Sequence, residues 1–156
     1  MSFRPRSILA AALIGAAAAV PLAAGAAAAP ARHESAQTAS VTQYVTDATR
    51  ATSALADFGK DLQQVDSLSE FKGQLTQLRR EVRTFDASIR KLRTYRLANR
   101  TIEGQRARLA RTGPVLAATL SRFLNAVRDA DASEVRDLLP KVNTDLRRFA
   151  RAAQVS

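Results

Sequence analysis

Apolar residues from Val41 onward recur at alternating three- and four-residue steps, the spacing of one buried face on an α-helix. Two runs keep this alternation over eight positions each without interruption. The first comprises Val41, Tyr44, Ala48, Ala51, Leu55, Phe58, Leu62 and Val65; the second comprises Leu68, Phe71, Leu75, Leu78, Val82, Phe85, Ile89 and Leu92. The two runs therefore predict two helices packed against other helices.

The pattern beyond residue 100 predicts two further helices, each with an internal proline. The third run comprises Ile102, Leu109, Leu116 and Phe123 with Gly113, Leu120 and Val127; the fourth comprises Val135, Leu139, Val142, Leu146, Phe149 and Ala153. Pro114 and Pro140 fall inside these runs, where a proline removes a backbone hydrogen bond. Because the apolar spacing continues in phase across both prolines, we predict kinks near them and not breaks.

Helix boundaries are signalled by capping residues. Ser67 and Glu70 form an S-x-x-E capping box where the first register ends. Thr101 is a candidate N-cap for the third helix, and Asp131 or Ser133 for the fourth.

Short connections make successive helices antiparallel, so we expect an all-α, up-down-up-down four-helix bundle over residues 40–156. In the alternative arrangement the second helix continues to about Thr112 and a short helix starts at Pro114. The second and third helices would then divide near residue 113 instead of residue 99.

The first thirty residues resemble an export signal and not a part of the fold. Arg4 and Arg6 precede an uncharged run from Ser7 to Pro30 that ends in small residues matching the A-x-A rule. This predicts a Sec-type secretory signal peptide over residues 1–28, with cleavage between 26 and 31. Residues 29–39 lack periodicity and are expected to be a flexible lead-in. An uncleaved membrane anchor is the alternative, but the run is alanine-rich and interrupted by Pro21.

The composition excludes most catalytic and cofactor chemistry. There is no cysteine, the one histidine is His33 in the lead-in, and the one methionine is Met1. Thiolate metal sites, haem ligation by His and Met, di-iron sites and Ser-His-Asp catalysis are therefore not expected. Asp57 and Asp61 lie one helical turn apart beside Lys60, and we interpret them as solvated surface acids. We expect no enzyme activity, no catalytic residue, no metal and no cofactor.

Positive charge is concentrated in the middle of the chain. The whole chain has a formal charge of +10, and residues 72–111 alone contain 12 Lys and Arg against 3 Asp and Glu. We expect a positive cap at one end of the bundle that extends down one side, and a binding surface for polyanions there. The candidate binding residues are Arg80, Arg83, Arg90, Lys91, Arg96 and Arg100.

These observations predict a secreted or envelope-associated, non-enzymatic binding or structural protein. The expected partners are an anionic envelope polymer, lipid headgroups or an acidic protein; no nucleic-acid-binding motif is present, and no transmembrane segment is expected after signal cleavage. The alternative is a chaperone-like or protein-interaction module that uses apolar surface near Tyr95 and Leu97, or a bundle that self-associates into a homo-oligomer. The segment from Leu75 to Arg79 resembles the L-T-x-x-Q motif of helical, basic periplasmic chaperones at two positions, with arginine in place of glutamine. We assign the chain to no family on this match.

Overall fold

The computed structural model describes residues 31–65 and 67–154, and only the backbone at residues 31–40 and 68. These residues form four helices and no strand: α2 (Ala31–Gln63), α3 (Leu68–Leu92), α4 (Arg100–Arg128) and α5 (Ala132–Ala153). The expected all-α, four-helix fold is confirmed. The expected signal peptide over residues 1–28 lies outside the described residues.

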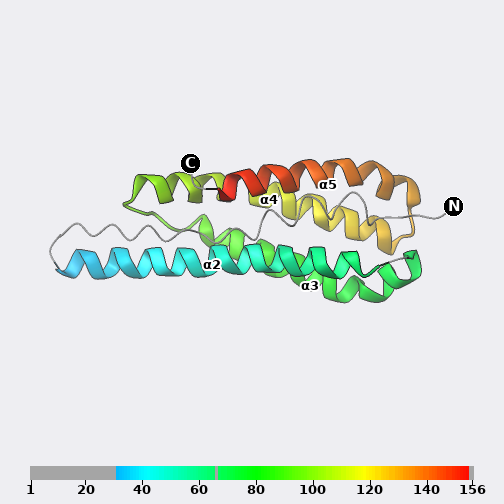
Figure 1. Cartoon of the computed structure of the whole chain (residues 1–156), viewed down its shortest axis with the longest axis horizontal. Helices are drawn as coiled ribbons and strands as arrows, with labels where there is room; N and C mark the ends of the chain where they lie inside the picture. Colours follow the sequence, from blue (N-terminus) through cyan, green and yellow to red (C-terminus); the bar gives the residue numbers. More distant parts are fainter. Residues whose placement is uncertain (1–30, 66, 155–156) are drawn as a thin grey trace.

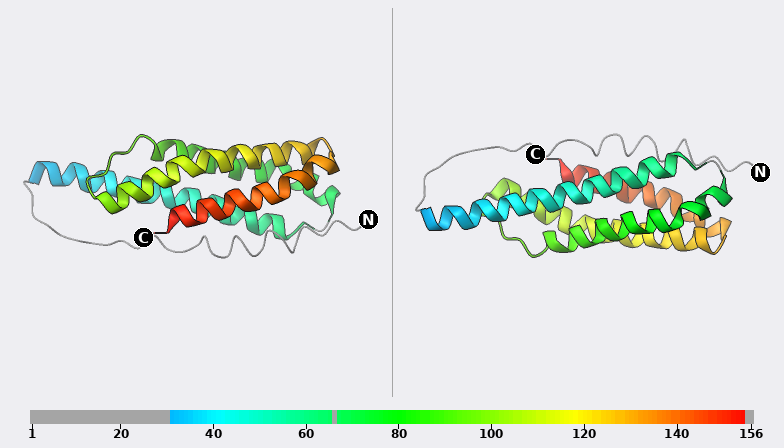
Figure 2. Two further views of the ribbon diagram at one scale, coloured as in Figure 1. Left: turned by 90° about the horizontal axis from the view of Figure 1, so that it is seen from above. Right: turned by 90° about the horizontal axis from the view of Figure 1, so that it is seen from below.

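The chain reverses direction at each connection, as the colour gradients of successive helices show (Figure 1). Helix α2 packs on α3, α3 on α4 and α4 on α5, whereas no described Cα atom of α2 lies within 8 Å of one in α5. The α3–α4 connection thus lies at one end of the bundle, and the α2–α3 and α4–α5 connections lie together at the other (Figure 2).

The apolar runs read from the sequence form the core. Every described side chain in them is buried except those of Val41, Leu75, Ile102 and Ala153, which are half-buried against the same core. Two edge-to-face aromatic pairs cross the core between helices: Phe71 with Phe123 (ring centroids 5.7 Å apart) and Phe85 with Phe149 (5.1 Å). The phenylalanines therefore connect α3 to both C-terminal helices.

The helix caps agree with the sequence at two of three sites. Ser67 and Glu70 form the predicted capping box of α3, and Asp131, one of two candidates, caps α5 by accepting a hydrogen bond from Glu134 N at 2.9 Å. Thr101 was the wrong choice for α4. Asn99 is the N-cap, because its Oδ1 atom accepts hydrogen bonds from the backbone of residues 101 and 102 at 3.0 and 3.1 Å.

Helix α2 begins earlier than the apolar run that predicted it. It starts at Ala31 and so includes residues 31–39, for which the sequence predicted a flexible lead-in. Residues 31–39 contain three alanines and no proline or glycine, so their intrinsic propensity favours a helix. The first turns of α2 extend beyond the other helices (Figure 2).

Both internal prolines lie within continuous helices, Pro114 in α4 and Pro140 in α5. The alternative in which the second helix continues to about Thr112 is wrong, because α3 ends at Leu92 and α4 begins at Arg100. Beside Pro114, a Cβ atom on Gly113 would lie only 2.6 Å from Ile89 Cγ2. The absence of a side chain at residue 113 therefore allows α4 to approach α3 closely.

Candidate functional site

Charge is sorted along the axis of the bundle. A plane across its middle separates a basic half (residues 41–55, 85–118 and 141–154), which contains the α3–α4 connection, from an opposite half (residues 56–84 and 119–140). Contacts such as Lys91 with Asp47 and Ile89 with Gly113 place the segments of the basic half at the same levels. By sequence, the basic half holds 13 Lys and Arg against 4 Asp and Glu, and the opposite half holds 8 against 9.

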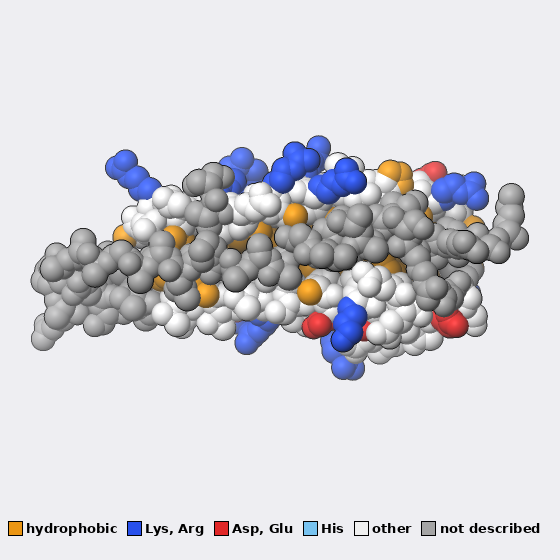
Figure 3. Space-filling model, in the orientation of Figure 1, with side chains coloured by type: hydrophobic (Ala, Val, Ile, Leu, Met, Phe, Trp, Pro, Cys, Tyr) orange, Lys and Arg blue, Asp and Glu red, His pale blue; other side chains and the backbone are white. Residues whose placement is uncertain are grey.

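The carboxylates are also sorted between the inside and the outside. In the basic half, Asp47 and Asp145 are buried and Asp86 and Glu103 are half-buried, so none of the four acids is exposed. Eleven of the 13 basic residues there are exposed; Arg106 is buried and Arg108 half-buried. In the opposite half, five of the eight described acids are exposed: Asp57, Glu70, Asp129, Asp131 and Asp137. The outer surface of the basic half is therefore almost purely cationic. The face drawn in Figure 3 shows several Lys and Arg side chains along the upper edge and others on the lower edge, with acidic side chains near the right-hand end and below the middle of the molecule.

The six candidate binding residues are all exposed, but they do not form one cluster. Arg90, Lys91, Arg96 and Arg100 lie in the basic half, around the α3–α4 connection. Arg80 and Arg83 lie in the opposite half. Arg96 donates hydrogen bonds to the carbonyl oxygens of residues 93 and 95, and Lys91 Nζ lies 3.6 Å from Asp47 Oδ1.

A groove between α3 and α4 connects part of this set. It consists of two adjoining cavities of about 250 and 430 Å³ that share Ser121. On the α3 side its lining residues recur at the spacing of one helix face: Arg79, Arg83, Asp86, Arg90 and Arg93. Val82 adds an apolar side chain on the α3 side, and the α4 side is lined by Pro114, Ala117, Ala118, Ser121, Leu124, Asn125 and Arg128. Five guanidinium groups therefore line the groove, together with side chains that are mostly short or apolar.

Only part of this charge is neutralised within the described chain. Arg90 forms an ion pair with Asp86 at 2.8 Å, and Arg128 one with Asp129 at 2.6 Å. Arg79 donates a hydrogen bond to Asn125 Oδ1 at 3.0 Å, which is a neutral partner. Five arginines thus face two carboxylates along the groove, which leaves an excess of three positive charges.

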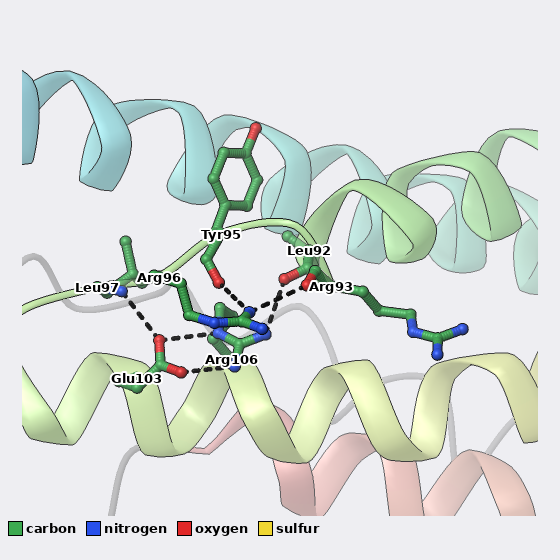
Figure 4. A network of polar contacts seen from close by, with 7 residues as sticks. All are labelled: Leu92, Arg93, Tyr95, Arg96, Leu97, Glu103 and Arg106. Atoms are coloured by element: carbon green, nitrogen blue, oxygen red, sulfur yellow. Dashed lines mark hydrogen bonds and ion pairs between the residues drawn. The ribbon is translucent and has the colours of Figure 1, made fainter.

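The α3–α4 connection is held by a buried arginine (Figure 4). Arg106 Nε donates a hydrogen bond to Glu103 Oε2 at 2.8 Å, and its Nη1 donates one to the Leu92 carbonyl oxygen, at the end of α3, at 3.0 Å. Glu103 also accepts a hydrogen bond from Leu97 N at 3.0 Å. The hydrogen bonds from Arg106 hold the pKa of Glu103 below its ordinary value, so the ion pair persists at neutral pH. Arg106 therefore fixes the connection and adds no charge to the surface.

A buried acid, Asp47 of α2, links the same connection to the first helix. Its Oδ2 atom accepts a hydrogen bond from the Tyr95 hydroxyl at 2.7 Å, and Arg50 lies 3.8 Å from its Oδ1 atom. Burial, together with this hydrogen bond, raises the pKa of Tyr95 to about 12, so the hydroxyl remains a donor. Leu97 is also buried. The apolar surface that we expected near Tyr95 and Leu97 is thus absent, and Val115 is the one large apolar side chain exposed in the described chain.

In the opposite half, Glu81 of α3 is buried without a cation beside it. It accepts a hydrogen bond from Gln77 Nε2 at 2.7 Å, while its Oε2 atom has no donor in the described chain. Burial raises the pKa of Glu81 to about 7; the nearby Asp61 and Asp57 carboxyl groups act in the same direction, and the Gln77 hydrogen bond opposes them. Asp61 is half-buried in this arrangement and Asp57 is exposed, so only Asp57 matches the expected surface acid.

Sequence reasoning missed several cationic residues of this surface. Arg79 and Arg93 were not selected, although their spacing with Arg83 and Arg90 follows a helical stripe beside the apolar run. That spacing was the available signal. The α5 residues Arg147, Arg148 and Arg151 were missed because only the fold brings them to the same half as the α3–α4 connection.

The described residues contain no group of three or more His, Cys, Asp or Glu side chains placed to hold a metal ion. Among these residues, none of the helices is both long and apolar enough to cross a membrane. No family model, no curated protein and no solved structure matches this chain. The proposals below therefore depend on the surface itself.

Proposed function

We propose that this chain is an exported, non-enzymatic binding or structural protein whose basic half attaches to polyanions of the cell envelope. The observation that carries the proposal is the sorting of charge: in the basic half the cations are outside and the acids are inside. A surface with this arrangement concentrates anions near it and strengthens their binding at low ionic strength.

Export places the polyanion outside the cytoplasm. Support for export comes from the sequence alone, through the positive and apolar pattern of residues 1–28. N-terminal sequencing of the protein recovered from its native host tests this part. A chain that starts between residues 27 and 32 is expected, and a chain that starts at Met1 would contradict it.

The binding itself is tested by retention of the purified protein on an immobilised polyanion, such as a heparin or polyphosphate column. We expect retention at low ionic strength that weakens steeply as salt is added. The charge-reversed variant Lys91→Glu/Arg96→Glu/Arg100→Glu should elute at clearly lower salt. The matched control Lys60→Glu/Lys72→Glu/Arg136→Glu changes the net charge equally at exposed positions in the opposite half. No retention of the wild type, or equal losses in both variants, would contradict the proposal.

A further inference from the structure

We propose that the ligand of this surface is a single linear polyanion, and that it lies lengthwise in the groove between α3 and α4. This inference depends on the proposed function, since it names the class of polyanion and its position. It concerns five arginines that all line the groove: Arg90 and Arg93 in the basic half, and Arg79, Arg83 and Arg128 in the opposite half. The polyanion would thus be held by the basic half at one end of the groove and extend past the middle of the bundle at the other.

The shape of the site favours an extended ligand. The two cavities adjoin at Ser121 and follow the α3 residues from 79 to 93. At 1.5 Å per residue, this stretch of helix is about 21 Å long. The α4 residues that line the second cavity, Pro114, Ala117, Ala118 and Ser121, have short side chains, so an extended chain can approach α4 closely there. A long, narrow, concave site of this kind fits an extended polymer better than a compact anion.

The spacing of the arginines favours a ligand with repeated charges. Arg79 and Arg83 form one pair a helical turn apart, and Arg90 and Arg93 form a second pair. The pair centres are separated by about 16 Å along the helix. Between them Asp86 forms an ion pair with Arg90 at 2.8 Å. Repeated oxyanion groups on one chain would contact both pairs in succession.

The chemistry of the cations favours oxyanions as the charged groups of the ligand. All five are arginines, whose planar guanidinium groups form two parallel hydrogen bonds with phosphate, sulfate or carboxylate oxygens. Ser121 adds an exposed hydroxyl donor where the two cavities meet. The groove therefore favours a chain of oxyanions over one acidic group.

A membrane surface fits these observations less well. Helices that bind bilayers insert apolar side chains below the headgroups, and Val115 is the one large apolar side chain exposed in the described chain. A bilayer would also contact convex ridges and leave the groove arginines without partners. Anionic vesicles are accordingly an arm of the test that we expect to show weaker binding.

The test titrates the purified protein with linear inorganic polyphosphates of increasing, defined length at constant low salt. Affinity is expected to rise with length until the chain spans about 21 Å, and then to level off once corrected for the number of binding positions. For flexible single strands, the logarithm of the binding constant falls by about 0.7 per contact for each tenfold increase in salt. If four charges of the polymer are neutralised, affinity should therefore fall roughly fifty-fold between 50 and 200 mM salt. Affinity that is independent of length would overturn the inference.

Two variants locate the contact. The groove variant Arg79→Gln/Arg83→Gln/Arg90→Gln/Arg93→Gln should lose most of this affinity and most of the salt dependence. The matched control Arg136→Gln/Arg147→Gln/Arg148→Gln/Arg151→Gln removes the same charge from exposed positions of α5 and should stay within about threefold of the wild type. Equal losses in the two variants would overturn the groove while leaving the proposed function intact.

A single added charge provides an independent check that does not depend on removing four arginines. Ser121→Glu places a carboxylate where the two cavities meet and should weaken polyphosphate binding about tenfold, whereas Thr144→Glu, at an exposed position of α5, should have little effect. Vesicles containing an anionic lipid should bind more weakly than long polyphosphate; tighter binding to vesicles would favour a membrane ligand. If neither probe binds at low salt, the proposed function fails as well.

Discussion

The two halves of the bundle use their acidic residues in opposite ways. In the basic half Glu103 is held by Arg106, and Asp47 by Tyr95 and Lys91, so each inward carboxylate has a charged or hydroxyl donor. In the opposite half Glu81 is buried beside Asp61 and Asp57 with no cation. The difference shows that net charge alone does not describe this surface. The basic half is cationic outside because none of its four acids is exposed: Glu103 and Asp47 hold the α3–α4 connection, Asp145 is buried against Thr119, and Asp86 pairs with Arg90.

The largest expected effect on stability comes from replacing Arg106, the arginine that holds the α3–α4 connection. Arg106→Met leaves Glu103 without its cation and the Leu92 carbonyl oxygen without its donor. Loss of one partner of a largely buried pair costs about 3 kcal/mol of unfolding free energy. Urea denaturation followed by circular dichroism measures this at pH 7.

The pH dependence distinguishes this effect from simple loss of packing. Because the folded-state pKa of Glu103 is lowered, its pair with Arg106 stabilises the protein above about pH 4.5 and is lost on acidification. The difference in unfolding free energy between the wild type and Arg106→Met should therefore become smaller at low pH. The double variant Arg106→Met/Glu103→Gln should regain about half of the lost stability at pH 7, and no recovery would contradict the role given to the pair.

The raised pKa of Glu81, in the opposite half, predicts that stability depends on pH in the opposite direction. Its folded-state pKa is raised from 4.5 to about 7, so the folded protein holds a proton that the unfolded chain releases. The stability contributed by protonated Glu81 is complete below about pH 4.5, falls as the pH rises to about 7, and is then constant. Glu81→Gln should lie within about 1 kcal/mol of the wild type at pH 5 and exceed it by about 3 kcal/mol at pH 8. Melting temperatures of both proteins from pH 5 to pH 8 measure this, and parallel profiles would contradict the assignment.

Two glycines of α4, Gly113 and Gly104, provide a matched test of the packing between α3 and α4. Gly113→Ala places a Cβ atom against the buried, β-branched Ile89 and should destabilise the protein by about 1–2 kcal/mol. The control Gly104→Ala, in the same helix, meets only the end of the Arg108 side chain at 3.9 Å. Its higher helix propensity should stabilise the protein by up to about 1 kcal/mol. Thermal unfolding of the two variants should therefore shift in opposite directions.

The smallest expected effect lies in the α4–α5 turn of the opposite half. Ala130 adopts a positive φ of 57°, a conformation that costs a side-chain-bearing residue energy that glycine does not lose. Ala130→Gly should therefore raise the unfolding free energy by about 0.5 kcal/mol without changing polyanion binding. Chemical denaturation with parallel column retention checks both parts, and a destabilised variant would contradict the interpretation.

The fold was largely readable from the sequence because apolar spacing reports directly which side of a helix is buried. The capping box at Ser67 was also local and therefore visible. The choice between Asn99 and Thr101 was not, since both are good N-cap residues and only backbone geometry separates them.

The candidate site was less predictable, because it depends on which helices become neighbours. Exposure of all six selected residues followed from the position of the apolar runs. By contrast, Arg106 was counted among the surface charges although it is buried, since its partner Glu103 and the Leu92 carbonyl become its environment only after folding. Asp47 and Asp145 similarly gave no sequence signal of burial, because their hydrogen-bond donors come from other parts of the fold: Tyr95 from the α3–α4 connection and Thr119 from α4.

Because Arg106 holds the α3–α4 connection in place, it should affect the kinetics of ligand binding. A segment that is already anchored at Leu92 and Leu97 before it meets a ligand holds its neighbouring cations at preset separations. Little chain entropy would then be lost on association. Encounter would be governed by long-range attraction and would slow steeply with added salt, whereas release would be governed by how many oxyanions a given polymer has engaged.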